Sequence, residues 1–375
     1  RPAEYTLLRW HVVHTTMLEK DPGRPRINRL RVIHLLEADY NLFLKVLYAR
    51  RMVWNAEDAS VLGQAQGGSR PGRNAIDIAL QKAVTYETAV ASKTNLATLD
   101  NDATGCYDRI LAGLAMIACR RLGMPIDACY VQAATLALMT FFLKTAHGIS
   151  TGSYSSTFSF PIFGTGQGSC ASPAIWLAIS IVLLNALQLV GRGVRFTSPT
   201  KKWDHSRHAD SFVDDATLWT NDQSLPTPLT PAELIDDLRI LAQTWRDLLF
   251  ASGGDLELGK CFYYALYWYW HNGYARPLAP DDFPQPLEIK DSTGQTILIK
   301  HKDVEDYHRT LGVRLNLLGQ MEGEYAFLKT KGDKYAALTQ SSVFSRQETD
   351  TAYWTSYLPS IGYSASITTF TPRQC

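Results

Sequence analysis

Two adjacent carboxylates, Asp214 and Asp215, are the residues of this sequence best placed to do chemistry. They lie in the segment 211–219 between two apolar, β-favouring runs, which predicts a strand, a tight turn carrying the acids and a returning strand. Because successive side chains of a strand point to opposite faces, a turn is what lets both acids reach one point. Two carboxylates this close repel each other unless a cation lies between them. An isolated Asp-Asp pair is more commonly an exposed surface turn, so the interpretation depends on the rest of the chain.

A second acidic strand end strengthens the chemical interpretation. Residues 95–99 form a predicted short strand that runs into Asp102, with Asp100 as a competing candidate two residues earlier. Three carboxylates can bridge two divalent cations about 3.5–4 Å apart, the arrangement that two-metal catalysis of an in-line displacement requires. Hard oxygen ligands of this kind suit Mg²⁺.

The composition is that of a globular protein rather than a disordered one. Of the 375 residues, 46% are apolar and 19% are charged, and the formal net charge of +1 does not by itself indicate a nucleic-acid-binding protein. Residues 1–51 are locally basic, with ten Lys and Arg against five Asp and Glu. Such a segment is equally consistent with a phosphate-binding face and with an ordinary solvated surface. The first residue is Arg1 rather than Met, so we expect a fragment of a longer protein.

The cysteines and histidines indicate which cellular compartment and which metal sites are compatible with this sequence. Six scattered cysteines form no CxxC pair, which predicts buried thiols in a reducing, intracellular compartment, with nucleus and cytoplasm not distinguished. The two His pairs at i, i+3 spacing have no accompanying cysteines, which argues against zinc. The longest apolar stretch, 174–190, contains Asn185 and Gln188 and predicts a buried helix rather than a membrane span.

Periodicity, caps and turn residues predict the elements that must position the acids. A turn is expected at 21–23, and Asn74, Ser172 and Thr230 are the expected helix N-caps. The aromatic run 262–270 predicts sheet core rather than a base-stacking platform. Expected helices span 39–54, 75–90, 110–121, 127–144, 172–190, 231–250, 325–338 and 347–358; expected strands span 24–36, 158–163 and 307–315; expected loops span 64–73 and 164–169, and an expected hairpin insertion lies within 275–305.

Seven short motifs follow one another between residues 24 and 313. They are R-V-I-H-L-L at 31–36 with D-Y-N at 39–41, the Gly/Pro/Arg-rich loop 64–73, D-A-T-G-C-Y-D-R-I at 102–110, G-Q-G at 166–168 with S-P at 172–173, F-V-D-D at 212–215, the block from S-G-G at 252–254 to Lys260, and L-G-V at 311–313. In this order they resemble a reverse transcriptase, specifically the polymerase domain of non-LTR (LINE-like) retrotransposons and their group II intron relatives. Each motif is weak alone, whereas the ordered set is specific.

The resemblance implies a catalytic centre built on carboxylates. Asp102, Asp214 and, less directly, Asp215 would hold two Mg²⁺ ions, with Mn²⁺ as a substitute, and the backbone carbonyl of Ala103 would be a further ligand. Lys260 would protonate the pyrophosphate leaving group, as general acids do. Asp102 is preferred to Asp100 because its six-residue step to Asp108 matches the family.

The resemblance also implies how substrates are held. Arg31 would neutralise the triphosphate, for which its planar fork is suited. Tyr107 would lie under the sugar of the incoming nucleotide and exclude a 2′-hydroxyl, and Gln167 would touch the nucleotide or the template backbone. The other implied substrate-binding residues are Arg73, Gly168 and Phe212, and Leu311 and Gly312 would position the primer end.

Two further departures from the family pattern are visible. Arg31 is followed by Val32 where the family usually has Pro, and the block before Lys260 has Gly254 in place of Leu, followed by Asp255. None removes an implied metal ligand, but they leave open a decayed copy with poor activity.

The predicted fold is an α+β right-hand polymerase with fingers, a palm of antiparallel sheet and a partial helical thumb. The expected divisions are 1–95 for the fingers and N-terminal region, 96–273 for the palm with fingers elements, 274–316 for the hairpin insertion and primer-grip strand, and 317–375 for the thumb-like helical region. The expected function is RNA-directed DNA synthesis by nucleotidyl transfer, with an RNA template, a DNA primer and dNTPs as partners and no membrane. An RNA-dependent RNA polymerase and a catalytically silent nucleic-acid-binding remnant remain alternatives, and any endonuclease or RNase H domain is expected outside this sequence.

Overall fold

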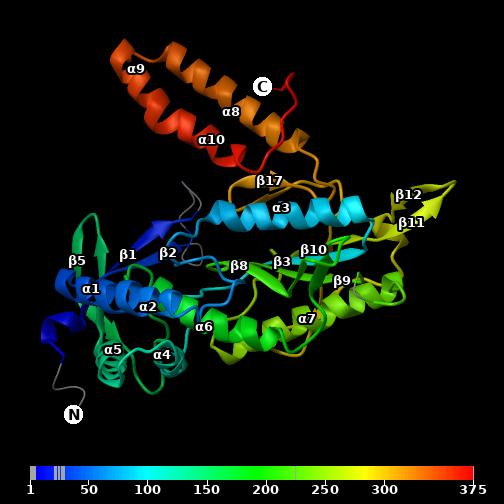
Figure 1. Cartoon of the computed structure of the whole chain (residues 1–375). Helices are drawn as coiled ribbons and strands as arrows, with labels where there is room; N and C mark the ends of the chain where they lie inside the picture. The colour runs from blue at the N-terminus through cyan, green and yellow to red at the C-terminus, as the bar shows by residue number, and fades with distance from the viewer. Residues whose placement is uncertain (1–5, 21–22, 24–25, 27–29, 224, 375) are drawn as a thin grey trace.

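The computed structural model describes residues 6–20, 23, 26, 30–223 and 225–374 (Figure 1). The expected turn at 21–23, apart from Gly23, and most of the basic segment 24–29 lie outside the described residues, as does Cys375. The chain forms a mixed α/β structure of several sheets and helices, in which two larger sheets carry most of the strands.

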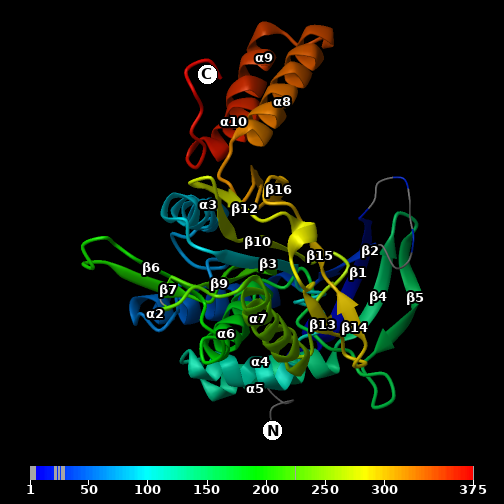
Figure 2. The ribbon, with the colours of Figure 1, turned by 90° about the vertical axis from the view of Figure 1, so that its right-hand side faces the viewer.

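The central sheet has five strands in the order β15 (Lys300–His301), β10 (Phe262–Leu266), β3 (Leu96–Asp102), β9 (Asp215–Asn221) and β8 (Ala209–Phe212). All pairings are antiparallel except β15 with β10. Helix α3 (Ala75–Ser92) covers one face, and α6 (Ser172–Leu187) and α7 (Pro231–Ala251) cover the other (Figures 1 and 2).

Alternation along the strands explains this layering. Leu96 and Trp219 pack with the apolar side of α3, whereas Leu99 and Leu218 belong to the larger core with α6 and α7. Burial of the apolar side chains on both faces is the main favourable contribution to the stability of such a layer. Asp100 and Asp102 lie at even positions of β3 and therefore share the α3 face with Leu96.

A second sheet has the order β2 (Leu30–Leu35), β1 (Val12–Glu19), β4 (Thr140–Thr145) and β5 (Gly148–Ser155), with β1 and β4 parallel. The short helix η2 (Leu8–His11) precedes this sheet in the chain. After β2 comes one continuous helical run of α1 (Ala38–Leu44), a π-helical stretch η4 (Lys45–Met52) and α2 (Val53–Asp58), and before β4 comes a helix pair, α4 (Ala112–Arg121) with α5 (Ile126–Leu138).

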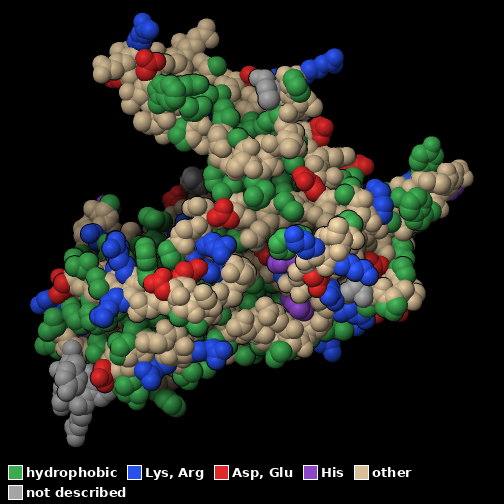
Figure 3. All heavy atoms as spheres, in the orientation of Figure 1, with side chains coloured by type: hydrophobic (Ala, Val, Ile, Leu, Met, Phe, Trp, Pro, Cys, Tyr) green, Lys and Arg blue, Asp and Glu red, His purple; other side chains and the backbone are tan. Residues whose placement is uncertain are grey.

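Four smaller hairpins and a helical C-terminal region complete the chain. The hairpins are β6 (Val194–Thr197) with β7 (Asp204–Arg207), β11 (Trp268–His271) with β12 (Tyr274–Pro277), β13 (Glu288–Lys290) with β14 (Thr296–Leu298), and β16 (His308–Thr310) with β17 (Val313–Leu315), and η5 (Pro280–Asp282) lies between the second and third. The C-terminal region is α8 (Glu322–Ser341), α9 (Arg346–Ala352), η6 (Tyr353–Tyr357) and α10 (Leu358–Ala365). These helices overhang the body in the space-filling view, where Lys and Arg side chains are interspersed with Asp and Glu (Figure 3).

Most local predictions are confirmed, because their signals are local. The acid hairpin, the capping box of Asn74 with Asp77 that opens α3, and that of Thr230 with Glu233 that opens α7 are all present. The apolar stretch 174–190 is largely the buried helix α6, as expected. None of the helices in the described part of the chain combines the length and apolarity that crossing a bilayer requires.

Four predictions of local structure are wrong, and one predicted strand is longer than expected. The helix expected over 127–144 ends at Leu138, because Thr140–Thr145 pairs with the distant β1. Residues 158–163 form no strand, and Phe158 is fully exposed. The expected strand 307–315 is a hairpin that turns at Leu311–Gly312, and the short strand 95–99 runs on to Asp102. Ser172 is the first residue of α6 rather than its N-cap, and its hydroxyl donates to the carbonyls of the preceding glycine-rich loop.

Candidate active site

The acid turn is the tight connection between β8 and β9. Val213 and Asp214 form the turn, and Asp215 is the first residue of β9, paired with Phe212. Val213 has φ of +59°, a left-handed conformation that is sterically costly for a β-branched residue. Something outside the hairpin must therefore hold this turn.

Gln66, in the Gly/Pro/Arg-rich loop, holds it. Its side-chain carbonyl accepts from the Val213 amide at 3.1 Å, and its side-chain amide donates to Ser211 Oγ at 3.0 Å. Trp176 of α6 adds a bond from Nε1 to the Val213 carbonyl at 2.6 Å. A Cβ at Gly68 would lie 2.5 Å from the Val213 amide, so the loop can approach the turn only with glycine at this position.

Sequence reasoning missed this role of Gln66. It assigned the loop 64–73 to substrate and singled out Arg73, whose guanidinium donates to Gln64 Oε1 at 2.7 Å in this structure. The available signal was a Gln followed by two glycines, which permits close backbone approach but does not say to what.

Strand β3 brings the second acid to the turn. Asp102 is the register partner of Asp215, and the Ala103 amide donates to the Asp214 carbonyl at 3.3 Å. Asp100 is engaged elsewhere, by ion pairing with Lys82 and by accepting from Thr217 Oγ1 at 2.8 Å. Asp102 shares a cavity with Asp214 that Asp100 does not line, whereas Asp100 lines a second, smaller cavity together with Asp102 and Asp215.

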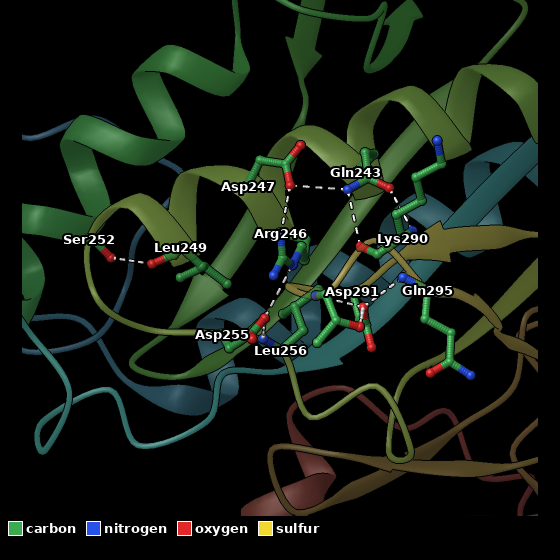
Figure 4. A network of polar contacts seen from close by, with 11 residues as sticks. Gln243, Arg246, Asp247, Leu249, Ser252, Asp255, Leu256, Lys290, Asp291 and Gln295 are labelled. Atoms are coloured by element: carbon green, nitrogen blue, oxygen red, sulfur yellow. Dashed lines mark hydrogen bonds and ion pairs between the residues drawn. The ribbon is translucent and has the colours of Figure 1, made fainter.

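Lys260 reaches Asp102 from the loop that follows α7. Its Nζ lies 2.6 Å from Asp102 Oδ2, and its side chain is 57% exposed. The start of this loop is tied to α7 through Arg246, whose Nε contacts Asp255 Oδ1 at 3.3 Å and whose Nη1 contacts Asp247 (Figure 4). The Asp255 carbonyl in turn accepts from the Thr104 amide at 2.8 Å, next to the end of β3. The loop that carries Lys260 and the strand that carries Asp102 are therefore fixed to each other.

The loop with Gln167 closes the opposite side. The Gln167 backbone carbonyl accepts from the His34 amide of β2 at 2.6 Å, and Gln167 Nε2 donates to Asp108 Oδ2 at 3.2 Å. A Cβ at Gly168 would lie 2.2 Å from the His34 carbonyl. The Tyr107 carbonyl accepts from the Thr165 amide at 2.7 Å, which joins this loop to the turn after β3.

These elements enclose a cavity of about 830 Å³. Eight of the residues expected to act on substrate or metal line it: Arg31, Asp102, Ala103, Tyr107, Gln167, Gly168, Asp214 and Lys260. The other three, Arg73, Phe212 and Asp215, do not line it.

A smaller cavity of about 230 Å³ adjoins the same acids. Asp102, Asp215, Lys260 and Leu311 all line it, so the turn of the β16–β17 hairpin lies beside the carboxylates. Gly312 lines a neighbouring open cavity between that hairpin and the C-terminal helices.

Burial is the main influence on the pKa values of the acid turn, and the neighbouring carboxylates add to it. Burial, with the nearby charge of Asp102, raises the pKa of Asp214, although Lys260 and Arg31 oppose the shift. The pKa of Asp215 is raised to about 6 by desolvation and then by Asp214 and Asp102. Both shifts mark a place where a positive charge would be favoured.

The acids suit a hard divalent cation in kind but are not gathered around one point. Carboxylate oxygens are the ligands that Mg²⁺ prefers. Within the described ranges, no group of three or more His, Cys, Asp or Glu side chains is arranged to hold a metal ion. Asp102 is instead paired with the Lys260 ammonium, which supplies a positive charge beside the acid turn.

Comparison with known proteins gives structural likenesses alone. No protein-family model and no curated protein sequence matches the chain. A telomerase from Candida albicans in complex with a TWJ fragment of telomeric RNA aligns with a TM-score of 0.48 and 13% identity over 98% of this chain and 60% of that one. Telomerase from Candida tropicalis aligns with 10% identity, with a TM-score of 0.49 in complex with the TWJ fragment and 0.46 as the apo form, each over 96% of this chain. The chain spans 55% and 58% of the length of these two C. tropicalis structures.

Proposed function

We propose that this chain is an RNA-directed DNA polymerase that transfers nucleotides from dNTPs to the 3′-hydroxyl of a DNA primer on an RNA template. One observation carries the proposal. Arg31, Asp102, Tyr107, Gln167, Asp214 and Lys260, which come from five motifs far apart in the sequence, all line one cavity. An ordinary surface Asp-Asp turn would not be expected to share a cavity with a tyrosine, a glutamine, an arginine and a lysine at the positions that the motifs predict.

The transfer is a displacement at the α-phosphorus of the incoming dNTP. The primer 3′-oxygen loses its proton to water and bonds to the α-phosphorus, the bond from that phosphorus to the bridging oxygen breaks, and pyrophosphate leaves. Lys260 is an ammonium beside Asp102 and can give a proton to the leaving pyrophosphate. Arg31, exposed on β2 at the cavity wall, would bind the triphosphate.

Asp102 and Asp214, with Asp215 as the third carboxylate, would hold Mg²⁺, with the Ala103 carbonyl beside them. When bound, the cations would stabilise the attacking and leaving oxygens. Their entry requires Lys260 to release Asp102, which its exposure permits. Tyr107, half-buried in the cavity wall, would contact the sugar and reject a 2′-hydroxyl.

The sheets correspond to parts of a polymerase hand under this proposal. The five-stranded sheet with α3, α6 and α7 would be the palm, the β2-β1-β4-β5 sheet the fingers, and α8 to α10 the thumb. The motif order supports a non-LTR retroelement as the source.

Primer extension on an RNA template with dNTPs and Mg²⁺ tests the proposal. The wild-type chain should extend the primer, and Asp214→Asn and Asp102→Asn should not. Extension by either variant at the wild-type rate would remove that residue from the catalytic set. Efficient use of ribonucleotides by the wild type would indicate an RNA polymerase instead. Salt-sensitive binding of primer–template without extension in Mg²⁺ or Mn²⁺ would indicate a silent remnant.

A further inference from the structure

A buried polar network lies under the acid cluster, on the α3 face of the central sheet. Its centre is Lys82 of α3, a lysine only 1% exposed. The Lys82 ammonium pairs with Asp100 and donates to Thr217 Oγ1 at 3.2 Å and to His308 Nε2 at 3.0 Å. These three contacts use all three donors of the ammonium.

The direction of each bond follows from the donor inventory. Lys82 can only donate, so His308 Nε2 accepts, and it also accepts from Thr310 Oγ1. The proton of the His308 ring therefore lies on Nδ1, which is 2.9 Å from Tyr264 Oη. The Tyr264 hydroxyl in turn donates to the Asp306 backbone carbonyl at 2.8 Å, which extends the hydrogen-bond network. The ring is neutral, in keeping with a pKa lowered to about 3 by burial and by Lys82.

The network connects the parts that the proposed reaction must hold in register. Asp100 lies two residues before Asp102 on β3, and Thr217 lies two residues after Asp215 on β9. His308 opens β16 and lies three residues before Leu311 in the hairpin turn. No bond of the backbone ladder of the central sheet reaches the β16–β17 hairpin in the described pairings, since its two strands pair only with each other.

We propose that Lys82 and His308 are positioning residues that fix the Leu311–Gly312 turn relative to Asp102 and Asp215. The inference rests on the proposed function, under which that turn holds the primer end. A primer 3′-oxygen displaced by about 1 Å can lower the rate of its reaction about 10²-fold, so the hairpin needs a fixed link to the acids. The Lys82 network supplies that link through side chains.

The two test variants are chosen so that neither leaves the Lys82 or Asp100 charge without its partner. His308→Phe keeps a ring and removes the acceptor, and Lys82→Met/Asp100→Asn removes both charges of the pair together. His308→Gln, which can accept from Lys82, is the conservative variant. Asn95→Ala is the matched control, because Asn95 is buried in a polar cluster with Asp222 and Trp268 at the opposite end of β3.

Steady-state extension, primer–template affinity and thermal melting are measured for each chain. We expect His308→Phe and the double variant to lower kcat by about tenfold or more, with primer–template affinity within about threefold of wild type. His308→Gln should recover most of the rate, and Asn95→Ala should leave kcat within about threefold at a similar loss of Tm. Unchanged kcat in His308→Phe, or an equal fall in Asn95→Ala, would overturn the inference.

Amide hydrogen exchange separates this inference from the proposed function, because it needs no activity. The double variant should lose protection at Thr310, Leu311 and Gly312 without unfolding β3. If the wild-type chain fails to extend any primer, the proposed function fails, and the exchange result alone decides the link. Unchanged exchange in the hairpin would then show that the network does not hold it.

Discussion

Asp102 of β3 and Asp215 of β9 face each other as direct register partners across two antiparallel strands. Like charges in such a pair destabilise a sheet, by up to about 1 kcal/mol in exposed cases. The strands nevertheless pair fully from Leu96 with Asn221 to this position. The sheet therefore holds two carboxylates together against their repulsion, and a third, Asp214, is adjacent in the turn.

Replacing one of these acids should separate activity from stability. Asp215→Asn is expected to raise the free energy of unfolding at pH 8 by up to about 1 kcal/mol in the absence of divalent cations, because it removes repulsion from Asp102 and Asp214. The same variant should extend primers more slowly than wild type. Chemical denaturation and extension rates measure the two effects, with Asp236→Asn on the exposed face of α7 as the control. A destabilised Asp215→Asn would mean that the carboxylate stabilises the fold.

The pH dependence of stability should carry the signature of Asp215. Its pKa is about 6 in the folded chain against a normal value near 4, so between these values the folded state binds more protons than the unfolded state. Stability therefore falls as pH rises from about 4 to about 6 on account of this group. The difference between wild type and Asp215→Asn, measured by denaturation across this range without divalent cations, should grow with pH and level off above it. A constant difference would contradict the raised pKa.

Gln66 should matter more than its neighbour Gln64. Gln66→Leu leaves the partly buried Val213 amide without its partner, which costs up to about 1–3 kcal/mol, and it frees a turn that is strained by itself. We expect lower stability together with loss of extension. Gln64→Leu, an exposed position two residues away, should change neither, and equal effects of the two variants would argue against a specific clamp.

Replacing Arg246 tests the ion pairs that anchor the loop carrying Lys260 to α7. Its side chain is 6% exposed and its guanidinium lies between Asp255 and Asp247, so Arg246→Met should lower the free energy of unfolding by about 3 kcal/mol. Arg239→Met on the same helix breaks an exposed pair with Asp236 and should cost at most about 0.5 kcal/mol. Urea denaturation of both variants measures the contrast. Similar losses in the two would show that burial does not distinguish the pairs.

Tyr107 should set the choice between deoxyribonucleotides and ribonucleotides. Tyr107→Ala opens the cavity wall where a 2′-hydroxyl would clash, so the preference for dNTPs over NTPs in kcat/KM should fall by roughly tenfold or more. Tyr107→Phe keeps the ring and should keep the preference. If the alanine variant discriminates as well as the wild type, another residue excludes the hydroxyl.

Sequence reasoning reached the parts of the structure that local signals encode. The acid hairpin, the caps at Asn74 and Thr230 and the glycine-flanked loop around Gln167 depend on neighbouring residues, and each was predicted. The convergence of distant motifs on one cavity was expected only from the resemblance that the ordered motifs carry, and not from local signals.

What the sequence did not reveal depends on partners far along the chain. Thr140–Thr145 has helix-compatible apolar residues and becomes a strand only because β1 offers a parallel edge. The Lys82 and Gln66 networks are tertiary, and no periodicity marks a lysine or glutamine that will be buried. The turn at Leu311–Gly312 was the exception, since Gly312, with φ of +99°, was a local signal that a continuous strand was the wrong interpretation.

The left-handed backbone of Val213 has a consequence for the order in which the protein is made. Gln66 and Trp176, the two side chains that hold Val213, both precede it in the chain. Both side chains are therefore synthesised before the turn that they hold. A fragment beginning after α6 would carry every residue of the turn but lack both side chains that hold Val213.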